Sequence, residues 1–545
     1  MSAWLRPDEL RIGLGCMRLG DDGAATVAAA VAAGITVFDT ARAYDGGEEL
    51  LASALAGVDG ARVVTKGGMA RPGGAWVPDG RAKAIRADCE ASLAALGGLP
   101  IDLYLLHAPD PRTPLETSLR ALARLQEEGL VARVGICNVN RAQLDEALEH
   151  APIAAVQVAL SVFDDRALRG GVVERCAELG VALIAHSPLG GPRRAARLAR
   201  DETLRELARS REATEAEVAL AWVLGLGPHV VAIPGARRPE TARSAARAAS
   251  LELTKTERAR IRPASRGRVR AKEAGDVVVV MGIPGAGKSR LARELAEQQG
   301  YLRLNRDERG GSLRDVAAAL DDALASGSRE VVLDNTYLSR AARSHVLDAA
   351  SSHGLPVRCV WLDTSLADAQ VNLVERLVAR LGRLPSPEEL RTLARDEPGV
   401  LTPTQQMRAA RELEPPSVDE GFASVERVAF ERAPREGRPG VFVAVSAVER
   451  LDADGIDPAQ PCLLFDWRPD GVAEDLERLA ARLPAPVETA ICPHGGGPPV
   501  CWCRPPLPGL ALAFAHRHGV DPARSRLVGT SRAHETLANA LGATF

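Results

Sequence analysis

The chain has 545 residues, a formal net charge of −3, 46% hydrophobic and 26% charged residues, and nine cysteines. This length allows three or four domains, and the composition is that of an ordinary soluble protein. The small net charge excludes a general attraction to nucleic acid, so such an affinity would need local patches. The start of the chain lacks a signal-peptide pattern, and no apolar run reaches the roughly 20 residues needed to cross a bilayer. We therefore expect a cytoplasmic protein with no membrane partner, and the sequence leaves its oligomeric state open.

From residue 1 to residue 254, short apolar strands alternate with amphipathic helices. The predicted strands are LRIGLGCM, GITVFDTA, ARVVTKGG, IDLYLLHAP, VARVGICN, AAVQVAL, VALIAHSPLG and HVVAIPGA. This alternation predicts parallel strands joined by right-handed crossovers. Eight strands suit a closed (β/α)8 TIM barrel better than an open sheet.

A basic connector follows at residues 255–275. It has eight Lys or Arg residues between Lys255 and Lys272, and one acidic residue, Glu257. We interpret it as a solvated linker. A strip that contacts nucleic acid is the alternative, which a charge run alone does not establish.

Two further α/β segments complete the chain. Residues 276–436 contain the apolar strands VVVVMGI, REVVLDNT and VRCVWLDT. Residues 437–545, which open within the Gly- and Pro-containing stretch PREGRPG, contain VFVAVSAV, CLLFDWRPDG, ETAICPH and RLVGTS. We expect each segment to form a small α/β domain of its own.

Four polar residues stand at or just after the carboxyl ends of predicted barrel strands, namely Asp39, Tyr44, Lys66 and His107. At this face of a barrel, side chains converge on a substrate. Tyr44 becomes a better acid if the ammonium group of Lys66 lowers its pKa; Asp39 would hold Lys66, and His107 would orient a carbonyl group. With a hydride donor, these residues predict carbonyl reduction.

Residues 8–253 resemble the aldo-keto reductases in FDTARAY, the Thr–Lys pair, LLHAPD, GICN, Gln157, HSPLG and IPGARRPE, which follow the family's order. The resemblance implies a nicotinamide cofactor and no bound metal in the barrel. We expect NADP(H), although the sequence leaves the choice between NADPH and NADH open. It also implies that Asn138 and Gln157 hold the nicotinamide carboxamide, and that Ser187 and Arg237 contact the cofactor phosphates. The carbonyl substrate stays unknown, because the loops that define it are the least legible part of such a barrel.

The segment departs from that family at several cofactor contacts. Cys137 replaces the usual serine, and His186 replaces the aromatic residue that commonly stacks on nicotinamide. Ser244 and Ala245 stand where acidic or amide residues often contact adenine. A barrel kept as a scaffold, or as a nicotinamide sensor that regulates a kinase, is therefore the alternative to a reductase.

The sequence GIPGAGKS follows an apolar strand and precedes an amphipathic helix, which is the context of a phosphate-binding loop. We expect the backbone at Gly282, Gly285 and Gly287 to surround the phosphates of ATP. Lys288 would reach the outer phosphates, and Ser289 would bind Mg²⁺.

Phosphoryl transfer also needs a base and further cations near the acceptor. Asp307 follows the next predicted strand and is placed to act as the general base toward a hydroxyl group, and VVLDNT supplies Asp334. We expect Arg383, with Arg376 and Arg380, to close over the transferred phosphoryl group. Lys288, Asp307 and Arg383 are thus the predicted catalytic residues of this segment.

This segment resembles the kinase domain of polynucleotide 5′-kinases in GIPGAGKSRLAREL, NRDE, VVLDNTYLSRAAR and ELEPPSVDEGFASV. The resemblance implies ATP-dependent phosphorylation of a 5′-hydroxyl group on RNA or DNA. Tyr337 stands where the family commonly has asparagine. A kinase for small alcohols, including those that a reductase would make, is the alternative.

Cys492, His494, Cys501 and Cys503 form the pattern CxH-x6-CxC, with Gly and Pro between the pairs. Two soft ligands on each of two tight turns suit a closed, tetrahedral Zn²⁺ site. We expect this zinc to be structural.

The zinc loop, CRPPLPG and RLVGTS resemble the haloacid-dehalogenase-type phosphatases, which implies a small Rossmann-like domain. Those enzymes attack phosphate with an aspartate of a DxD motif, where this chain has Ala444 and Ser446. Their later magnesium-binding aspartate corresponds to Thr530, and Asp466 lies after the next strand. Because an aspartyl-phosphate requires the carboxylate, we expect an inactive phosphatase-like domain.

Overall fold

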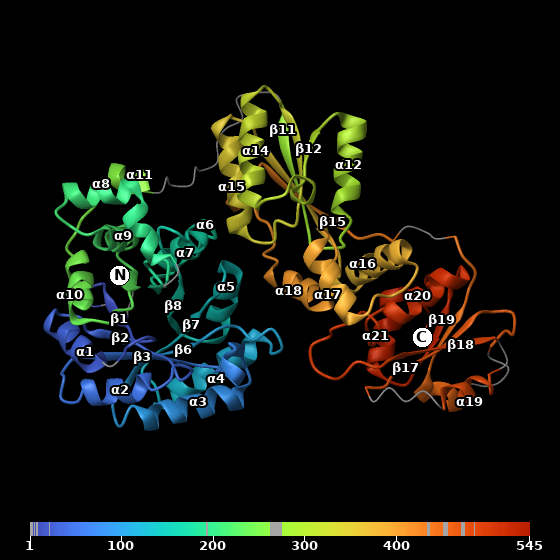
Figure 1. Cartoon of the computed structure of the whole chain (residues 1–545), viewed down its shortest axis with the longest axis horizontal. Helices are drawn as coiled ribbons and strands as arrows, with labels where there is room; N and C mark the ends of the chain where they lie inside the picture. The colour runs from blue at the N-terminus through green and yellow to red at the C-terminus, as the bar shows by residue number, and fades with distance from the viewer. Residues whose placement is uncertain are drawn as a thin grey trace. The chain divides into compact units, whose positions relative to one another are not determined.

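The computed structural model describes residues 4, 6, 9–20, 22–191, 194–261, 275–432, 436–450, 456–469, 475–483 and 486–545. The chain divides into two compact units, Met1–Ser265 and Arg266–Phe545 (Figure 1). Among the residues described, no helix has the length and apolar character that a membrane span requires.

The first unit is a ring of eight parallel strands surrounded by helices. The strands neighbour one another in the order β1-β2-β3-β6-β7-β8-β9-β10, and the bridges Ile12–Ala232 and Gly15–Gly235 join the first strand to the last. Their bounds are β1 (Gly13–Gly15), β2 (Val37–Asp39), β3 (Arg62–Gly67), β6 (Ile101–Leu106), β7 (Val134–Cys137), β8 (Ile153–Ala159), β9 (Ala182–His186) and β10 (Val230–Ile233). The predicted TIM barrel is confirmed.

The helices of this unit follow the strands in turn. They are α1 (Gly23–Ala32), α2 (Gly47–Ala54), α3 (Ala82–Ala95), α4 (Leu115–Glu127), α5 (Arg141–His150), α6 (Arg166–Arg169), α7 (Val172–Leu179), α8 (Glu202–Ser210), α9 (Glu215–Leu224), α10 (Pro239–Ala248) and α11 (Lys255–Ile261). A hairpin of β4 (Met69–Ala70) and β5 (Val77–Pro78), with the 3-10 turn η1 (Pro72–Gly74) between them, follows β3.

The barrel has two apolar layers, as the alternation along each strand requires. In β6, Leu103 and Leu105 belong to one buried cluster with residues of β2, β3, β7, β8, β9 and β10, whereas Tyr104 and Leu106 pack with residues of the helices. Position 135 of β7 requires glycine, because the neighbouring strand β8 lies too close for a side chain. A Cβ atom there would lie 2.3 Å from the carbonyl oxygen of Ala155.

The basic connector begins differently from the prediction. Its first residues form α11. Two ion pairs join α11 to α8: Arg260 pairs with Glu206 at 2.6 Å, and Glu257 pairs with Arg211, the C-cap of α8, at 2.7 Å. The side chains of Thr254 and Glu257 each accept a hydrogen bond from the other residue's backbone N–H, which forms a capping box at the start of α11. The sequence analysis considered only the charges of this segment and did not recognise the capping pattern. Residues 262–274, which make up the rest of the connector except Gly275, lie outside the described part of the chain.

The second unit contains two parallel sheets. The five-stranded sheet has the order β12-β13-β11-β14-β15, and the four-stranded sheet the order β18-β17-β16-β19. The strands are β11 (Asp276–Met281), β12 (Leu302–Leu304), β13 (Glu330–Asp334), β14 (Val357–Asp363), β15 (Ser424–Ala429), β16 (Val441–Ala444), β17 (Cys462–Trp467), β18 (Val487–Cys492) and β19 (Arg526–Val528). β15 was not predicted, because two charged residues separate the two valines of its sequence, SVERVA.

Helices connect these strands. They are α12 (Lys288–Gln299), α13 (Arg306–Arg309), α14 (Leu313–Ala325), α15 (Arg340–Ser352), α16 (Leu366–Leu381), α17 (Pro387–Asp396), α18 (Pro403–Glu412), α19 (Leu476–Ala480), α20 (Gly509–His518) and α21 (Arg532–Leu541).

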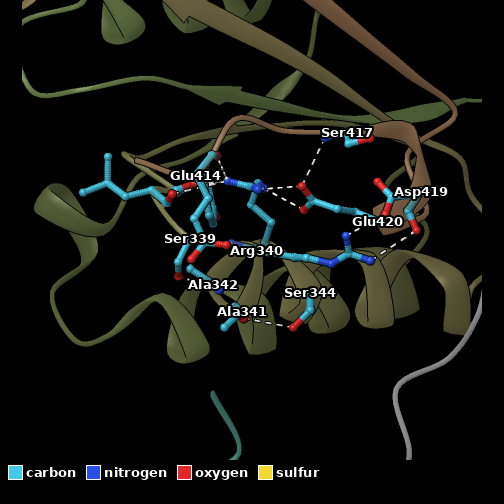
Figure 2. A network of polar contacts seen from close by, with 12 residues as sticks. Ser339, Arg340, Ala341, Ala342, Ser344, Glu414, Ser417, Asp419 and Glu420 are labelled. Carbon is cyan, nitrogen blue, oxygen red and sulfur yellow. Dashed lines mark hydrogen bonds and ion pairs between the residues drawn. The ribbon is translucent and has the colours of Figure 1, made fainter. Parts of the chain in front are cut away.

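The segment that follows α18 is fastened to α15 by charged groups (Figure 2). The buried Arg343 pairs with the buried Glu420 at 2.5 Å and also donates to the carbonyl oxygens of Tyr337 and Glu414. Arg340 pairs with Asp419 at 2.8 Å. These contacts hold the chain between α18 and β15 against α15.

Candidate functional site

The carboxyl ends of the barrel strands bring three of the predicted residues together around one ammonium group. The Nζ atom of Lys66 lies 2.7 Å from Oδ1 of Asp39 and donates to the carbonyl oxygen of Thr40 at 2.7 Å. The same Nζ atom lies 5.3 Å from the ring centroid of Tyr44. Lys66 and Asp39 are almost fully buried, so the pair has little access to water.

The electrostatics of Tyr44 differ from the prediction. Burial raises the pKa of Tyr44, while the ammonium of Lys66 lowers it by a smaller amount, so the hydroxyl group stays protonated. Burial alone would lower the pKa of Lys66, but Asp39 and Tyr44 outweigh it and raise the pKa, so the ammonium keeps its charge. The sequence indicated that the charged Lys66 lies near Tyr44, but it could not indicate how deeply Tyr44 is buried.

His107 lies beside Tyr44, with ring centroids 5.8 Å apart. Burial, with the nearby charge of Lys66, lowers the pKa of His107 to about 3, so the imidazole is neutral. Its Nδ1 atom is buried and has no hydrogen-bond partner among the described residues. A neutral ring with an unsatisfied nitrogen is suited to contact a polar atom of a ligand.

Trp76 was missed by the sequence analysis. It stands on the β4–β5 hairpin, with its ring centroid 6.1 Å from that of Tyr44 and 5.6 Å from that of His107. The guanidinium group of Arg71 stacks on the indole at 3.8 Å. An exposed Trp in a loop gave no periodic signal, so only the fold could place it here.

The predicted cofactor residues line the same end of the barrel. Gln157 donates to Oδ2 of Asp39 at 2.7 Å, and Asn138 donates to the carbonyl oxygen of His107 at 3.0 Å. His186 contacts Oδ1 of Asn138 at 3.1 Å and Oγ of Ser187 at 3.3 Å. Asn138 and Ser187 both have positive φ angles, 58° and 51°, a backbone conformation that is uncommon for residues other than glycine. Arg237 is exposed in the loop between β10 and α10.

The phosphate-binding loop of the second unit opens on a cavity of about 1110 Å³. Gly282, Gly285 and Gly287 have φ angles of 149°, 92° and 94°, so the loop has a backbone that glycine adopts readily. Lys288 begins α12 and donates to the carbonyl oxygen of Ile283 at 2.9 Å, and burial lowers its pKa to about 8. All four residues except Gly282 line the cavity.

Ser289 is joined to a buried carboxylate network. Its Oγ atom donates to Asp334 at 3.2 Å, and Asp334 also pairs with Arg303 at 2.6 Å and accepts from Asn305 at 2.9 Å. A hydroxyl group and a carboxylate side by side at a phosphate loop are the ligands that Mg²⁺ takes in nucleotide sites. Arg303 was not anticipated, because nothing in its local sequence marks it.

The remaining predicted kinase residues separate into two groups. Asp307, in α13, and Arg376, in α16, line the cavity; Asp307 also pairs with Arg306 at 2.9 Å. Arg383 does not line it, and its guanidinium group pairs instead with Glu389 at 2.8 Å. Helix α16 ends at Leu381 with Gly382 as its C-cap, so Arg383 belongs to the following turn and faces α17.

Tyr337 lies away from the cavity. Its side chain is fully buried in the core below β13, and its hydroxyl group accepts from Asn335 at 3.3 Å. Asn335 itself lines the cavity. The position at which asparagine was expected therefore lies in the core of the domain and not in the cavity wall.

The four metal-ligand candidates of the C-terminal sheet converge. Their ligand atoms lie within 4.8 Å of one another, with Nδ1 of His494 at 3.3 Å from Sγ of Cys503 and 3.5 Å from Sγ of Cys492. Sγ of Cys492 lies 3.6 Å from Sγ of Cys501, and the three cysteines are buried. Three thiols and an imidazole in so small a volume fit a tetrahedral Zn²⁺ ion.

The positions that would hold phosphatase carboxylates carry other groups. Ala444 ends β16, Ser446 follows it, and Oγ of Ser446 shares a 2.5 Å hydrogen bond with Oγ1 of Thr530 after β19. Asp466, near the end of β17, pairs with Arg468 at 2.8 Å.

Comparison with known proteins gives two family matches. The model of the aldo/keto reductase family matches residues 11–266, and a model described as an AAA domain matches residues 277–397. An uncharacterized oxidoreductase of Schizosaccharomyces pombe is 30% identical over 259 residues, which make up 45% of this chain and 83% of the relative. An aldo-keto reductase of Strobilurus tenacellus is 31% identical over 281 residues, 46% of this chain and 82% of the relative.

Solved structures match the same half of the chain. The glycerol dehydrogenase of Gluconobacter oxydans is 28% identical and covers 48% of this chain and 95% of its own, with a TM-score of 0.44. An aldo-keto reductase of Klebsiella pneumoniae in complex with NADPH is 28% identical and covers 47% of this chain and 91% of its own, with a TM-score of 0.42. Through residues 11–266 the chain belongs to the aldo/keto reductase family, and a P-loop domain follows that reductase domain.

Proposed function

We propose that the barrel reduces an aldehyde or ketone with NADPH. The observation that carries the proposal is the group formed by Asp39, Lys66, Tyr44 and His107 at the carboxyl ends of the strands. A protonated tyrosine next to a permanent ammonium group can give up its proton, because the ammonium stabilises the tyrosinate that forms.

Each residue then has a separate role in the reduction. When bound, the cofactor supplies the hydride to the carbonyl carbon. Tyr44 gives its hydroxyl proton to the carbonyl oxygen, Lys66 stabilises the remaining phenolate, and Asp39 keeps Lys66 charged and in place. The neutral His107 contacts the carbonyl oxygen and orients it toward Tyr44.

The cofactor residues fit a bound nicotinamide with one rearrangement. The side-chain amide of Asn138 donates to the carbonyl oxygen of His107, and that of Gln157 donates to Asp39. Ser187 follows β9, and the exposed Arg237 follows β10. The contact of His186 with Asn138 would give way when a carboxamide binds.

The test is the loss of NADPH absorbance with a panel of aldehydes and ketones. Turnover of any carbonyl compound supports a reductase. Tight NADPH binding with no turnover of the panel, combined with a changed rate of phosphoryl transfer, would instead favour a nicotinamide sensor.

We further propose that the P-loop domain phosphorylates the 5′-hydroxyl end of RNA or DNA with ATP and Mg²⁺. The carrying observation is the cavity in which Lys288, Ser289, Asp334 and Asp307 lie together. Lys288 would hold the outer phosphates, Ser289 and Asp334 would hold Mg²⁺, and Asp307 would take the proton of the acceptor hydroxyl. Arg376, rather than Arg383, is the arginine placed to stabilise the transferred group.

The size and charge of the cavity favour an anionic acceptor. At about 1110 Å³ it lies at the upper end of the usual range for ligand sites, so it has room for ATP and part of an acceptor. Beyond Arg376, its wall carries the following arginines: Arg290, Arg293, Arg306 and Arg432. Guanidinium groups bind phosphates well, so a chain of phosphodiesters suits this wall better than a neutral alcohol does.

The proposal is tested with γ-labelled ATP, Mg²⁺ and 5′-hydroxyl oligonucleotides of RNA and of DNA. Label on an oligonucleotide supports it, and comparison of the two acceptors names the substrate. Label on small alcohols alone would make the domain a small-molecule kinase.

Residues 437–545 are proposed to be a haloacid-dehalogenase-like domain that has lost phosphatase activity and keeps a structural Zn²⁺. The supporting observations are Ala444, Ser446 and Thr530 at the ends of β16 and β19, and the convergence of the four soft ligands. Hydrolysis of a phosphate monoester by this protein would contradict the loss of activity.

A further inference from the structure

We propose that Trp502 is a positioning residue for the nucleotide cavity, through which the Cys/His cluster (Cys492, His494, Cys501 and Cys503) sets nucleotide affinity. This inference rests on the proposed binding of ATP at the phosphate loop. It gives the otherwise inactive C-terminal sheet a role in that site.

Trp502 connects the cluster to the cavity wall directly. It stands between Cys501 and Cys503, is 3% exposed, and donates through Nε1 to the carbonyl oxygen of Leu401 at 3.2 Å. Leu401 lines the nucleotide cavity. The carbonyl oxygen of Trp502 accepts from Gly509 at the start of α20, where a Cβ atom would lie 2.5 Å from that oxygen.

A shared apolar core makes the same connection over a larger area. One buried cluster includes Leu373, Val374 and Leu377 of α16 together with Trp502, and with residues of β16, β17, α20 and α21. Leu384, just beyond α16, packs against the three cysteines of the Cys/His cluster. The C-terminal sheet therefore supports the buried face of α16.

The opposite face of α16 belongs to the cavity. Asn372, Glu375 and Arg376 line it, and Asn372 donates to the carbonyl oxygen of Gly285 in the phosphate loop at 2.8 Å. A displacement of α16 would move Arg376 and loosen the phosphate loop at the same time.

Arg432 adds a further connection at the end of β15. It lines the cavity, pairs with Asp368 of α16 at 2.6 Å, and donates to the carbonyl oxygen of Ala540 in α21 at 2.9 Å. Three separate contacts thus fix the cavity wall to the C-terminal sheet: Trp502 to Leu401, the shared core, and Arg432.

Metal binding at the Cys/His cluster would stiffen this support. Four ligands around one ion fix the two turns that carry Cys492 and Cys503, and with them the indole of Trp502. Without the ion, the thiols have only weak contacts to hold the turns. The expected consequence is a cavity wall that is less well placed for nucleotide.

The test measures ATP binding to the full chain by calorimetry, with metal content determined for each preparation. Trp502→Phe removes the donor to Leu401 and replaces the buried indole with a smaller aromatic ring. Trp361→Phe is the matched control, because it makes the same change of side chain in β14 of the same unit, where Nε1 of Trp361 is buried and has no hydrogen-bond partner among the described residues.

We expect Trp502→Phe to weaken ATP binding about fivefold, the effect of one hydrogen bond, with unchanged metal content and unchanged NADPH binding. Trp361→Phe should bind ATP as the wild type does. Removal of the metal by a chelator should weaken ATP binding in the wild type and have a smaller effect in Trp502→Phe.

Equal ATP affinity of wild type and Trp502→Phe, or wild-type affinity that survives metal removal, would overturn the inference while leaving the ATP site standing. Failure of the metal-loaded wild type to bind ATP at all would overturn the proposed kinase and this inference with it.

Discussion

At the scale of single residues, the barrel depends on a lysine that stays charged inside the protein. Lys66 can do so because Asp39 lies 2.7 Å from its ammonium group and offsets the loss of water. The same ammonium stands beside the tyrosine whose proton the proposed reduction needs. Burial raises the pKa of Tyr44, so the hydroxyl group keeps its proton until the substrate oxygen becomes negatively charged.

Tyr44→Phe should lower kcat for carbonyl reduction about a hundredfold or more, because it removes the proton donor. NADPH affinity should change little, since the ring remains. The matched variant is Tyr104→Phe, which removes a hydroxyl group that donates to the carbonyl oxygen of Ile85 outside the site. Steady-state rates of both variants check the prediction, and a Tyr44→Phe enzyme as fast as Tyr104→Phe would contradict it.

His107 should make the stability of the barrel depend on pH. Its pKa is about 3 in the folded protein and about 6.5 when unfolded, so between these values the unfolded chain binds the extra proton. Stability therefore falls as pH falls below about 6.5. From pH 6.5 to 5 the wild type should lose about 1.5 kcal/mol more than His107→Gln does, because the difference in bound protons rises from about one half at pH 6.5 toward one.

Hydrogen exchange of the barrel strands under increasing urea measures this difference, with the other histidines common to both proteins. Equal losses in the two proteins would show that His107 is already protonated at pH 5.

At the scale of elements, the phosphate loop is held from outside as well as by its own glycines. Asn372 of α16 binds the carbonyl oxygen of Gly285, and the buried Gln406 of α18 donates to that of Pro284 at 3.0 Å. Two helices that follow the loop by many residues therefore fix its shape.

Gly285→Ala should weaken ATP binding about tenfold or more, because the added Cβ would lie 2.3 Å from the carbonyl oxygen of Ala369 in α16. Gly300→Ala is the control: it has the same left-handed backbone, at φ 78°, with no atom within 4 Å of the added group. Calorimetric titration with ATP compares the two. If both lose affinity equally, backbone strain rather than the contact with α16 is the cause.

The buried pair of Arg343 and Glu420 gives a test of the segment before β15. Glu420→Gln should destabilise the second unit by about 3–5 kcal/mol, because it leaves a buried guanidinium group without its counter-charge. Glu412→Gln breaks the exposed pair with Arg408 and should change stability little. Denaturant midpoints of the two variants measure the difference.

The sequence predicted most of these elements because their signals are local. Apolar runs marked the barrel strands, and the glycine and lysine spacing marked the phosphate loop. Groups that depend on distant contacts were not predictable: Trp76 reaches Tyr44 through a hairpin, and β15 pairs with β14 although its sequence is polar. Arg376 lies within α16, whereas Arg383 lies beyond its end. Where the helix ends depends on the turn at Gly382.

At the scale of the whole molecule, two sites of different chemistry lie in two separately folded units. The residues named for each site belong to one unit: Asp39, Tyr44, Lys66 and His107 to the first, and the phosphate loop with its cavity to the second. The proposal therefore predicts that the loss of one activity leaves the other in place.

The most direct measurement is transfer of label from γ-labelled ATP to a 5′-hydroxyl oligonucleotide by three proteins: the wild type, Tyr44→Phe and Asp307→Asn. We predict transfer by the wild type and by Tyr44→Phe, and its loss in Asp307→Asn, whose carboxylate would accept the proton of the acceptor. No transfer by the wild type, or transfer by Asp307→Asn at the wild-type rate, would contradict the account of the second site. Loss of transfer in Tyr44→Phe would contradict the independence of the two.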